Sequence, residues 1–79
     1  METMYYTTRQ TTTSGTALDT KSVTGRDKEE AILNAKIKAY KAMETFKNES
    51  TMIDAYVNVS DLETGTSYVS EHWEAVTAE

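Results

Sequence analysis

The stretch from residue 28 to residue 47 constrains the fold more than any other part of this sequence, because it predicts one long helix. Asp27 followed by Glu30 matches a capping box, and residues 28–47 contain neither glycine nor proline. Asn48 suits a left-handed stop directly after this stretch. We therefore expect a helix over residues 27–47.

One face of this predicted helix is strongly apolar. Its members recur at the spacing of a helical turn, at about 100° per residue. Such a face normally packs on a sheet or on another helix, and here we expect a sheet. The residues of this face are Ile32, Ala35, Ala39, Met43 and Phe46, flanked by Ala31 and Ala42.

A second apolar stripe lies about 140° around the same helix by this arithmetic. It consists of Leu33, Ile37 and Tyr40. A surface helix of a small domain needs only one apolar face, so we expect this stripe to be the interface of a homo-oligomer, a dimer or a ring. The alternative is that the N-terminal hairpin covers the stripe within one chain through Tyr5 or Leu18.

Residues 51–76 predict a hairpin after the helix. Residues 51–60 alternate between apolar and polar, residues 61–65 form a short loop, and Gly65 suits its left-handed position. The alternation places Ile53, Ala55, Val57 and Val59 on the core side, facing Val69 and Trp73 on the returning strand. The expected register pairs Ser60 with Thr66, Val57 with Val69, and Ile53 with Trp73.

Residues 4–24 predict a first hairpin that is rich in threonine. Ser14 and Gly15 suit a two-residue turn, which would set Tyr6 beside Val23. Threonine favours strands without needing burial, and both faces become polar toward the turn. We expect the base of this hairpin to join the sheet and its tip to project into water or onto a partner. The alternative is a mobile tip without a role.

The predicted fold is therefore α+β, in the order ββαββ, with one helix packed on a four-stranded antiparallel sheet. The 79 residues suit a single domain over residues 1–79. The chain contains no cysteine, which excludes disulfides and thiolate metal sites. Residues 1–4 show neither a basic nor an apolar leader segment, so we expect a cytoplasmic protein with no membrane partner.

The net charge of −5 is unevenly distributed. Residues 1–47 hold all eight Lys and Arg residues and carry a net charge of +2, whereas residues 48–79 carry −7. This asymmetry indicates either ordinary solubilising charge or an acidic end that meets a basic partner or the basic end of another copy. The lysines of the helix point in scattered directions, so we expect no duplex nucleic acid as a partner.

No motif predicts catalysis, a metal or a cofactor. In the expected register Asp54 lies opposite His72, with Ser70 on the same face. A nucleophile also needs oxyanion donors and a pocket, which the sequence does not indicate, so we expect a surface pair and no catalytic residues. A single histidine does not make a metal site, and the three glycines match no phosphate-binding pattern.

The side of the second hairpin that faces away from the helix is the better candidate for a binding site. We expect Tyr56, Asn58, Tyr68 and His72 to share it, together with Met52. Tyrosine and histidine among small polar residues favour contact with a protein or a planar ligand, although an ordinary solvated face remains the alternative. Should the ligand be anionic and bind elsewhere, the next candidates are the basic residues Arg9, Lys21 and Arg26.

Two segments carry a resemblance: SVTGRDKEEAILNAKIKAYKAM at residues 22–43 and DAYVNVSDLETGTSYVSEHWE at residues 54–74. Together with the threonine-rich start, they resemble small uncharacterised proteins encoded by phages and prophages of Firmicutes. The resemblance implies a binding protein that blocks a host defence protein or sequesters a signalling nucleotide. With the second apolar stripe of the helix, the aromatic sheet face and the absence of a catalytic motif, we expect a non-enzymatic, phage-derived homo-oligomer in the host cytoplasm. The alternative is a structural or assembly component of a phage particle, without a small-molecule ligand.

Overall fold

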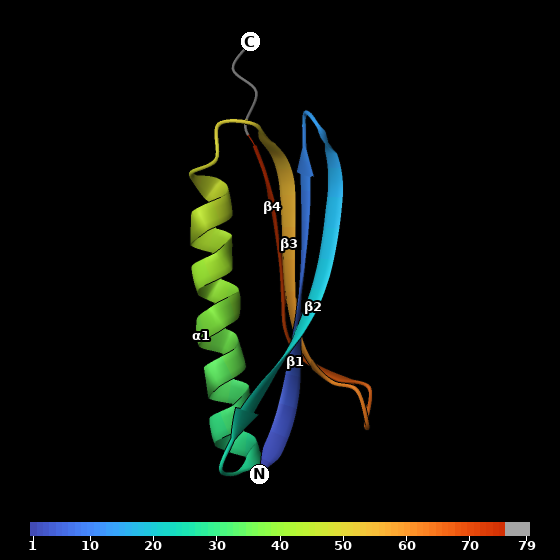
Figure 1. Cartoon of the computed structure of the whole chain (residues 1–79), viewed down its shortest axis with the longest axis vertical. Coiled ribbons are helices and arrows are strands. Elements are labelled where there is room, and N and C mark those ends of the chain that lie inside the picture. Colours follow the sequence, from blue (N-terminus) through green and yellow to red (C-terminus); the bar gives the residue numbers. More distant parts are fainter. Residues whose placement is uncertain (76–79) are drawn as a thin grey trace.

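The computed structural model describes residues 1–75 and contains four strands and one helix (Figure 1). The pairing is antiparallel throughout, in the sheet order β2-β1-β3-β4. The predicted α+β fold, with the order ββαββ, is confirmed. The elements are β1 (Glu2–Thr12), β2 (Gly15–Gly25), α1 (Lys28–Lys47), β3 (Met52–Asp61) and β4 (Thr66–Glu74).

The helix begins as the capping pattern predicts. The side chain of Asp27 accepts a hydrogen bond from the Glu30 backbone at 2.8 Å, which satisfies one of the free N–H groups of the first turn. Glu30 reaches back past the cap and binds the side chain of Arg26 at 2.8 Å. These local bonds fix the point at which the chain leaves β2 and enters α1.

The end of the helix differs from the expectation. Asn48 has a φ of −91° and is right-handed, so the predicted left-handed stop is wrong. Its side-chain amide instead donates to the carbonyl of Glu44 at 3.0 Å, and its backbone N–H turns back to Thr45. Asn48 thus ends the helix by occupying free carbonyl groups of the last turn.

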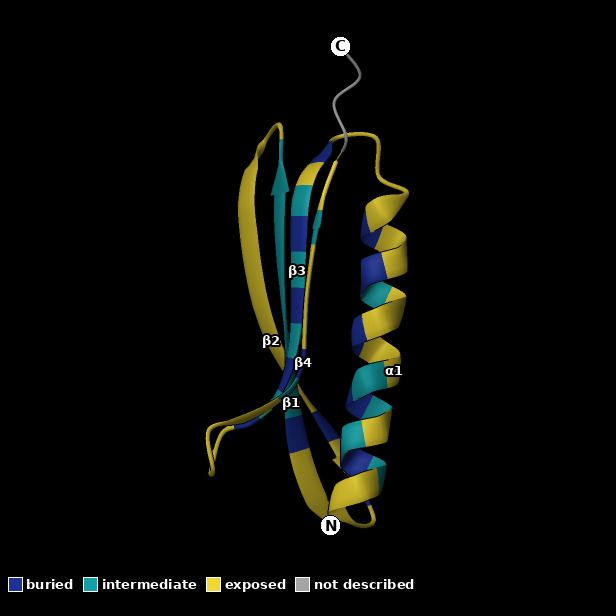
Figure 2. Ribbon diagram, turned by 180° about the vertical axis from the view of Figure 1, so that it is seen from behind, coloured by how far each residue is buried: buried dark blue, intermediate teal, exposed yellow. Residues whose placement is uncertain are grey.

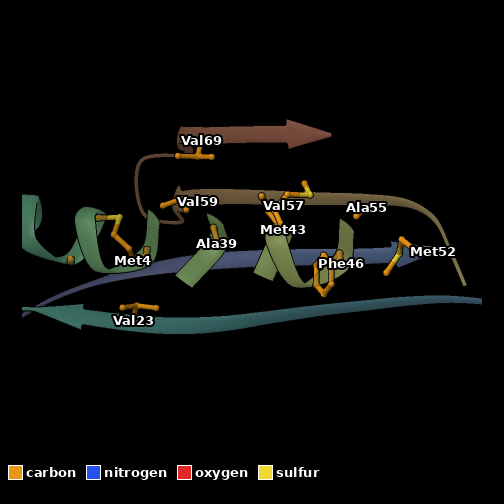
Figure 3. Close-up of a cluster of buried hydrophobic side chains, with 12 residues drawn as sticks. Met4, Val23, Ala39, Met43, Phe46, Met52, Ala55, Val57, Val59 and Val69 are labelled. Atoms are coloured by element: carbon orange, nitrogen blue, oxygen red, sulfur yellow. The ribbon is translucent and has the colours of Figure 1, made fainter. Parts of the chain in front are cut away.

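Alanines allow α1 to lie close against one face of the sheet. Ala31, Ala35 and Ala39 are 0% exposed, and their small side chains let the helix backbone approach the strands. The predicted apolar face is confirmed except that Ala31 is fully buried and Ile32 only partly. Figure 3 shows this face meeting the sheet side chains, among which Met4, Val57 and Val59 are the largest that are fully buried.

The first hairpin forms with a register two residues away from the expected one. Met4, not Tyr6, lies opposite Val23, and the turn consists of residues 13–14, flanked by Gly15 with a φ of 131°. Thr12 Oγ1 accepts a bond from the backbone of residue 14 at 3.1 Å, which stabilises this turn. A slip of two residues leaves every side chain on its original face, so the polar pattern does not distinguish the two registers.

The threonine-rich strand β1 lies inside the sheet. It pairs with β2 on one side and with β3 on the other from Tyr5 to Thr12, so the expectation that the hairpin tip projects freely is wrong for β1. Of the two strands of this hairpin, β2 is the one at a sheet edge, and its residues from Gly15 to Ser22 are exposed (Figure 2). The fold therefore places threonine in a central strand with one face uncovered.

Two irregularities change the second hairpin. A bulge near Ile53 turns Met52 into the core at 5% exposure and leaves Ile53 49% exposed, the reverse of the expected assignment. A second irregularity next to Ser60 shifts the β3–β4 pairing, so Val69 lies opposite Val59 and Trp73 opposite Ala55. The predicted position of Gly65 is confirmed by its φ of 73°.

Candidate functional site

The side of the sheet opposite α1 is uncovered by the other elements in residues 1–75 (Figures 1 and 2), and we call it the open face. All four strands contribute to it with side chains that alternate with the buried ones. These side chains are almost all polar or aromatic. The central ones are Thr7 and Arg9 on β1, Thr20 on β2, Tyr56 and Asn58 on β3, and Ser70 and His72 on β4.

Tyr56 occupies the middle of the open face. Arg9 lies opposite it on β1, and His72 lies opposite it on β4. The guanidinium carbon of Arg9 is 5.5 Å from the centroid of the Tyr56 ring, which is a cation–π distance. The Ser70 hydroxyl donates to the Tyr56 hydroxyl at 3.3 Å. The tyrosine ring is therefore held by neighbours on both adjoining strands.

Two further hydrogen bonds order side chains on the open face. Asn58 Nδ2 donates to Ser67 Oγ at 2.7 Å, linking β3 to β4. The hydroxyls of Thr7 and Thr20 lie 3.0 Å apart and link β1 to β2. The polar side chains on this face are thus cross-linked across strands, and less side-chain entropy remains to be lost when a partner binds.

Tyr68 was expected on the open face, but the structure does not place it there. The irregularity beside Ser60 brings Ser67 to the position beside Asn58 and lets Tyr68 pack against the buried core. Tyr68 there lies close enough to Lys28 on α1 to raise the pKa of that lysine. Met52 is likewise buried, so the expected cluster of two tyrosines and a methionine is reduced to Tyr56.

The Lys28 ammonium lies 3.3 Å from Asp61 Oδ2 and ties the start of α1 to the end of β3. The hydrogen bond with Asp61, followed by that with Tyr68, raises the pKa of Lys28. Burial raises the pKa of Asp61, but the bonds from the Glu63 backbone and from Lys28 outweigh it and lower the pKa overall. This cluster fixes the helix against the second hairpin.

The expected pairing of Asp54 with His72 is wrong. Asp54 lies opposite Glu74, while His72 lies opposite Tyr56, so the set of Ser70, His72 and Asp54 has no acid opposite its histidine. The Oδ1 atom of Asp54 is buried without a hydrogen-bond partner among the described residues. Within residues 1–75, no three His, Asp or Glu side chains gather as a metal site.

The basic residues proposed for an anionic ligand lie in three places. Arg9 is on the open face, and Arg26 follows β2 and pairs with Glu30 at 2.8 Å. Lys21 lies on the helix side of β2, 3.7 Å from Asp19. The structure does not bring Arg9, Lys21 and Arg26 together into one site.

The stripe of Leu33, Ile37 and Tyr40 is exposed at 56%, 55% and 47%. Leu18 is 70% exposed, and Tyr5 lies opposite Ser22 and Ser60 on the side of the sheet away from α1. The hairpin therefore uses neither residue to cover the stripe within one chain. The stripe therefore remains an apolar surface without a partner in the described chain, and its role as an oligomer interface stays a prediction.

Sequence reasoning missed a groove between β2 and α1, with a volume of about 480 Å³. It is lined on the helix side by Ile37, Lys38 and Lys41 and on the β2 side by Val23. Asn34 also lines the groove, and its Nδ2 donates to the carbonyl of Thr24 at 3.1 Å. The groove depends on the distance between helix and strand, which no local pattern encodes.

Comparison of the chain with protein-family models, with curated proteins and with solved structures finds no match. In the described part of the chain, no helix is both long enough and apolar enough to span a membrane.

Proposed function

We propose that this protein is a non-enzymatic binding protein whose open face recognises a partner protein. The observation that carries the proposal is Tyr56, held between Arg9 and Ser70 in the middle of a sheet face that α1 leaves uncovered. Tyrosine and arginine are among the residues most enriched at the energetic centres of protein interfaces. Around them lie small hydroxyl and amide side chains, which supply adaptable hydrogen bonds.

The shape and charge of the open face favour a protein over a nucleotide. Small-molecule sites are usually concave, whereas this face is formed by four adjacent strands, and the β2–α1 groove lies on the other side of the sheet. The strands also carry Asp54 opposite Glu74 beside the central residues, which disfavours an anionic ligand. A broad sheet face with ordered side chains instead suits another folded protein.

The resemblance to phage proteins extends this proposal. It supports a phage-derived protein that acts in the bacterial cytoplasm by occupying a surface of a host component such as a defence protein. The exposed apolar stripe on α1 supports a homo-oligomer. The rival proposal, a structural component of a phage particle, would use the same sheet for self-assembly alone. The two differ in whether the open face has a partner other than this chain.

The test places a photo-cross-linking residue at His72, an exposed position opposite Tyr56 on the open face, and, as a control, at Glu44 on α1. We expect a host protein that is captured from position 72 and not from position 44. Purified, that protein should bind Tyr56→Ala about tenfold or more weakly than wild type, and Leu62→Ala, a change of an exposed loop residue, equally well. Equal affinity for Tyr56→Ala would show that the open face is not the binding surface.

A further inference from the structure

The strand β2 is an unusually open sheet edge. It is eleven residues long, lies at the end of the strand order, and pairs with β1 from Gly15 to Gly25 without a shift in register. Exposed edges pair readily with other strands, and natural proteins usually protect them with proline, bulges or short length. The edge formed by β2 has none of these three protections.

The backbone of β2 offers its hydrogen-bonding groups in a regular row. In an antiparallel ladder, successive residues direct their N–H and C=O groups alternately to the two sides of a strand. The carbonyl of Thr24 accepts a bond from Asn34 and so points away from β1. By the same alternation, the groups of Ser22, Thr20 and Leu18 point outward and are oriented to pair with a further strand.

We propose that the strand that pairs with this edge is β2 of a second copy. The two β2 strands would run antiparallel about a two-fold axis at Thr20. Thr20 is the midpoint of Gly15–Gly25, so the pairing is centred on β2. It would run from Leu18 to Ser22, because the carbonyl of Thr24 is already bonded to Asn34. It sets Thr20 opposite Thr20 of the second copy, and Leu18 opposite Ser22, all with outward-pointing backbone groups. An interface of this kind is self-complementary, as two-fold symmetry requires.

The charges on β2 fit this register. Asp19 and Lys21 flank Thr20, lie 3.7 Å apart on the helix side, and are 60% and 64% exposed. A charged residue on this side of an edge strand normally hinders pairing, because it would meet the same charge or an apolar group. About the axis at Thr20, however, each Lys21 meets Asp19 of the second copy, so both cross-strand pairs are opposite in charge.

The other edge of the sheet lacks this complementarity. β4 contains Glu71 and Glu74 but neither lysine nor arginine, and its pairing with β3 includes a shift in register. Pairing two copies about its midpoint, Ser70, would place Glu71 opposite Val69. The acidic edge is thus protected from self-pairing, and β2 is the edge that fits a second copy.

The proposed pair would join two sheets into one. A two-fold axis perpendicular to the sheet keeps both copies of α1 on the same side, so the two open faces become one continuous surface. A partner with two equivalent sites would then bind with increased avidity. The pairing specifies how the homo-oligomer of the proposed function would form, but it rests on the sheet edge and not on Tyr56. It would therefore hold even if the open face bound no partner.

The first test uses the absence of native cysteine. In the proposed register the two Cα atoms of residue 20 lie about 5.5 Å apart, within the range that a disulfide spans. Under mild oxidation, Thr20→Cys should therefore form a disulfide-linked dimer. The matched control is Ser70→Cys, the midpoint of β4, which should stay monomeric on a non-reducing gel.

The second test exchanges the charges. Asp19→Lys should weaken the dimer about tenfold, because two lysine–lysine pairs replace two opposite-charge pairs, and sedimentation velocity measures this. The double variant Asp19→Lys/Lys21→Asp should restore wild-type affinity, with circular dichroism confirming the fold of each variant. Equal cross-linking of Thr20→Cys and Ser70→Cys, no cross-linking at Thr20, or a double variant as weak as the single one would each overturn the proposal.

Discussion

Arg9 on β1 lies over the ring of Tyr56 on β3, with its guanidinium carbon 5.5 Å from the ring centroid. The two residues are direct cross-strand partners on the open face. Both are partly buried, so the contact is less screened by water than a fully exposed pair. This pair joins the threonine-rich hairpin to the second hairpin at the centre of the proposed binding surface.

The Arg9–Tyr56 contact should be measurable in the free protein. We expect a double-mutant cycle of Arg9→Ala and Tyr56→Ala to give a coupling of about 0.5–1 kcal/mol in the free energy of unfolding. The measurement is urea denaturation of the wild type, both single variants and the double variant. Strictly additive effects would mean that the two side chains do not interact in solution.

The Lys28–Asp61 pair predicts a specific loss of stability in acid. Asp61 has a lowered pKa in the folded state, so its stabilising effect is present above the unfolded pKa of about 3.9 and is lost as the pH falls through the folded pKa. The melting temperature of the wild type should therefore fall toward that of Asp61→Asn below about pH 4.

At neutral pH, by contrast, the wild type should have a higher melting temperature than Asp61→Asn. The raised pKa of Lys28 acts at the opposite end of the scale. Its contribution is present below the unfolded pKa of about 10.4 and is lost as the pH rises through the folded value. A difference between wild type and Asp61→Asn that stays constant from pH 7 to pH 2 would contradict this assignment.

Gly25 should tolerate no side chain. It is buried where β2 meets α1, and a Cβ atom there would overlap the backbone of Glu30 and Ala31. Because backbone atoms cannot move aside cheaply, we expect Gly25→Ala to destabilise the fold by about 1–3 kcal/mol. Thr24→Ala, at the exposed neighbouring position, should change stability by less than about 0.5 kcal/mol. Thermal denaturation that shows the same stability for both variants would refute the close approach.

Ile37→Lys tests the apolar stripe. Ile37 is 55% exposed, so the variant should remain folded with nearly unchanged stability, whereas Ala39→Lys, at a fully buried position of the same helix, should unfold. If the stripe is an oligomer interface, sedimentation velocity of the wild type should show species larger than a dimer. These larger species should be absent from Ile37→Lys. Identical sedimentation of wild type and Ile37→Lys would remove the stripe as an interface.

The sequence by itself determined the elements and the class of fold. The cap at Asp27, the alanine face of α1 and the left-handed Gly65 are local features, because each depends on residues within a few positions of one another. Two hairpins separated by one helix then leave few arrangements other than an antiparallel sheet with the helix on one face. The second apolar stripe on α1 could be predicted for the same reason, but the sequence does not indicate what would cover it.

Only the tertiary structure decided the register and the membership of the open face. A slip of two residues keeps every side chain on its face, so alternation alone did not distinguish Met4 from Tyr6 as the partner of Val23. The irregularities near Ile53 and Ser60 moved Met52 and Tyr68 toward the core, and bulges arise from packing between strands. The contact between Arg9 and Tyr56 depends on β1 lying beside β3, which joins segments distant in the chain and which no local pattern encodes.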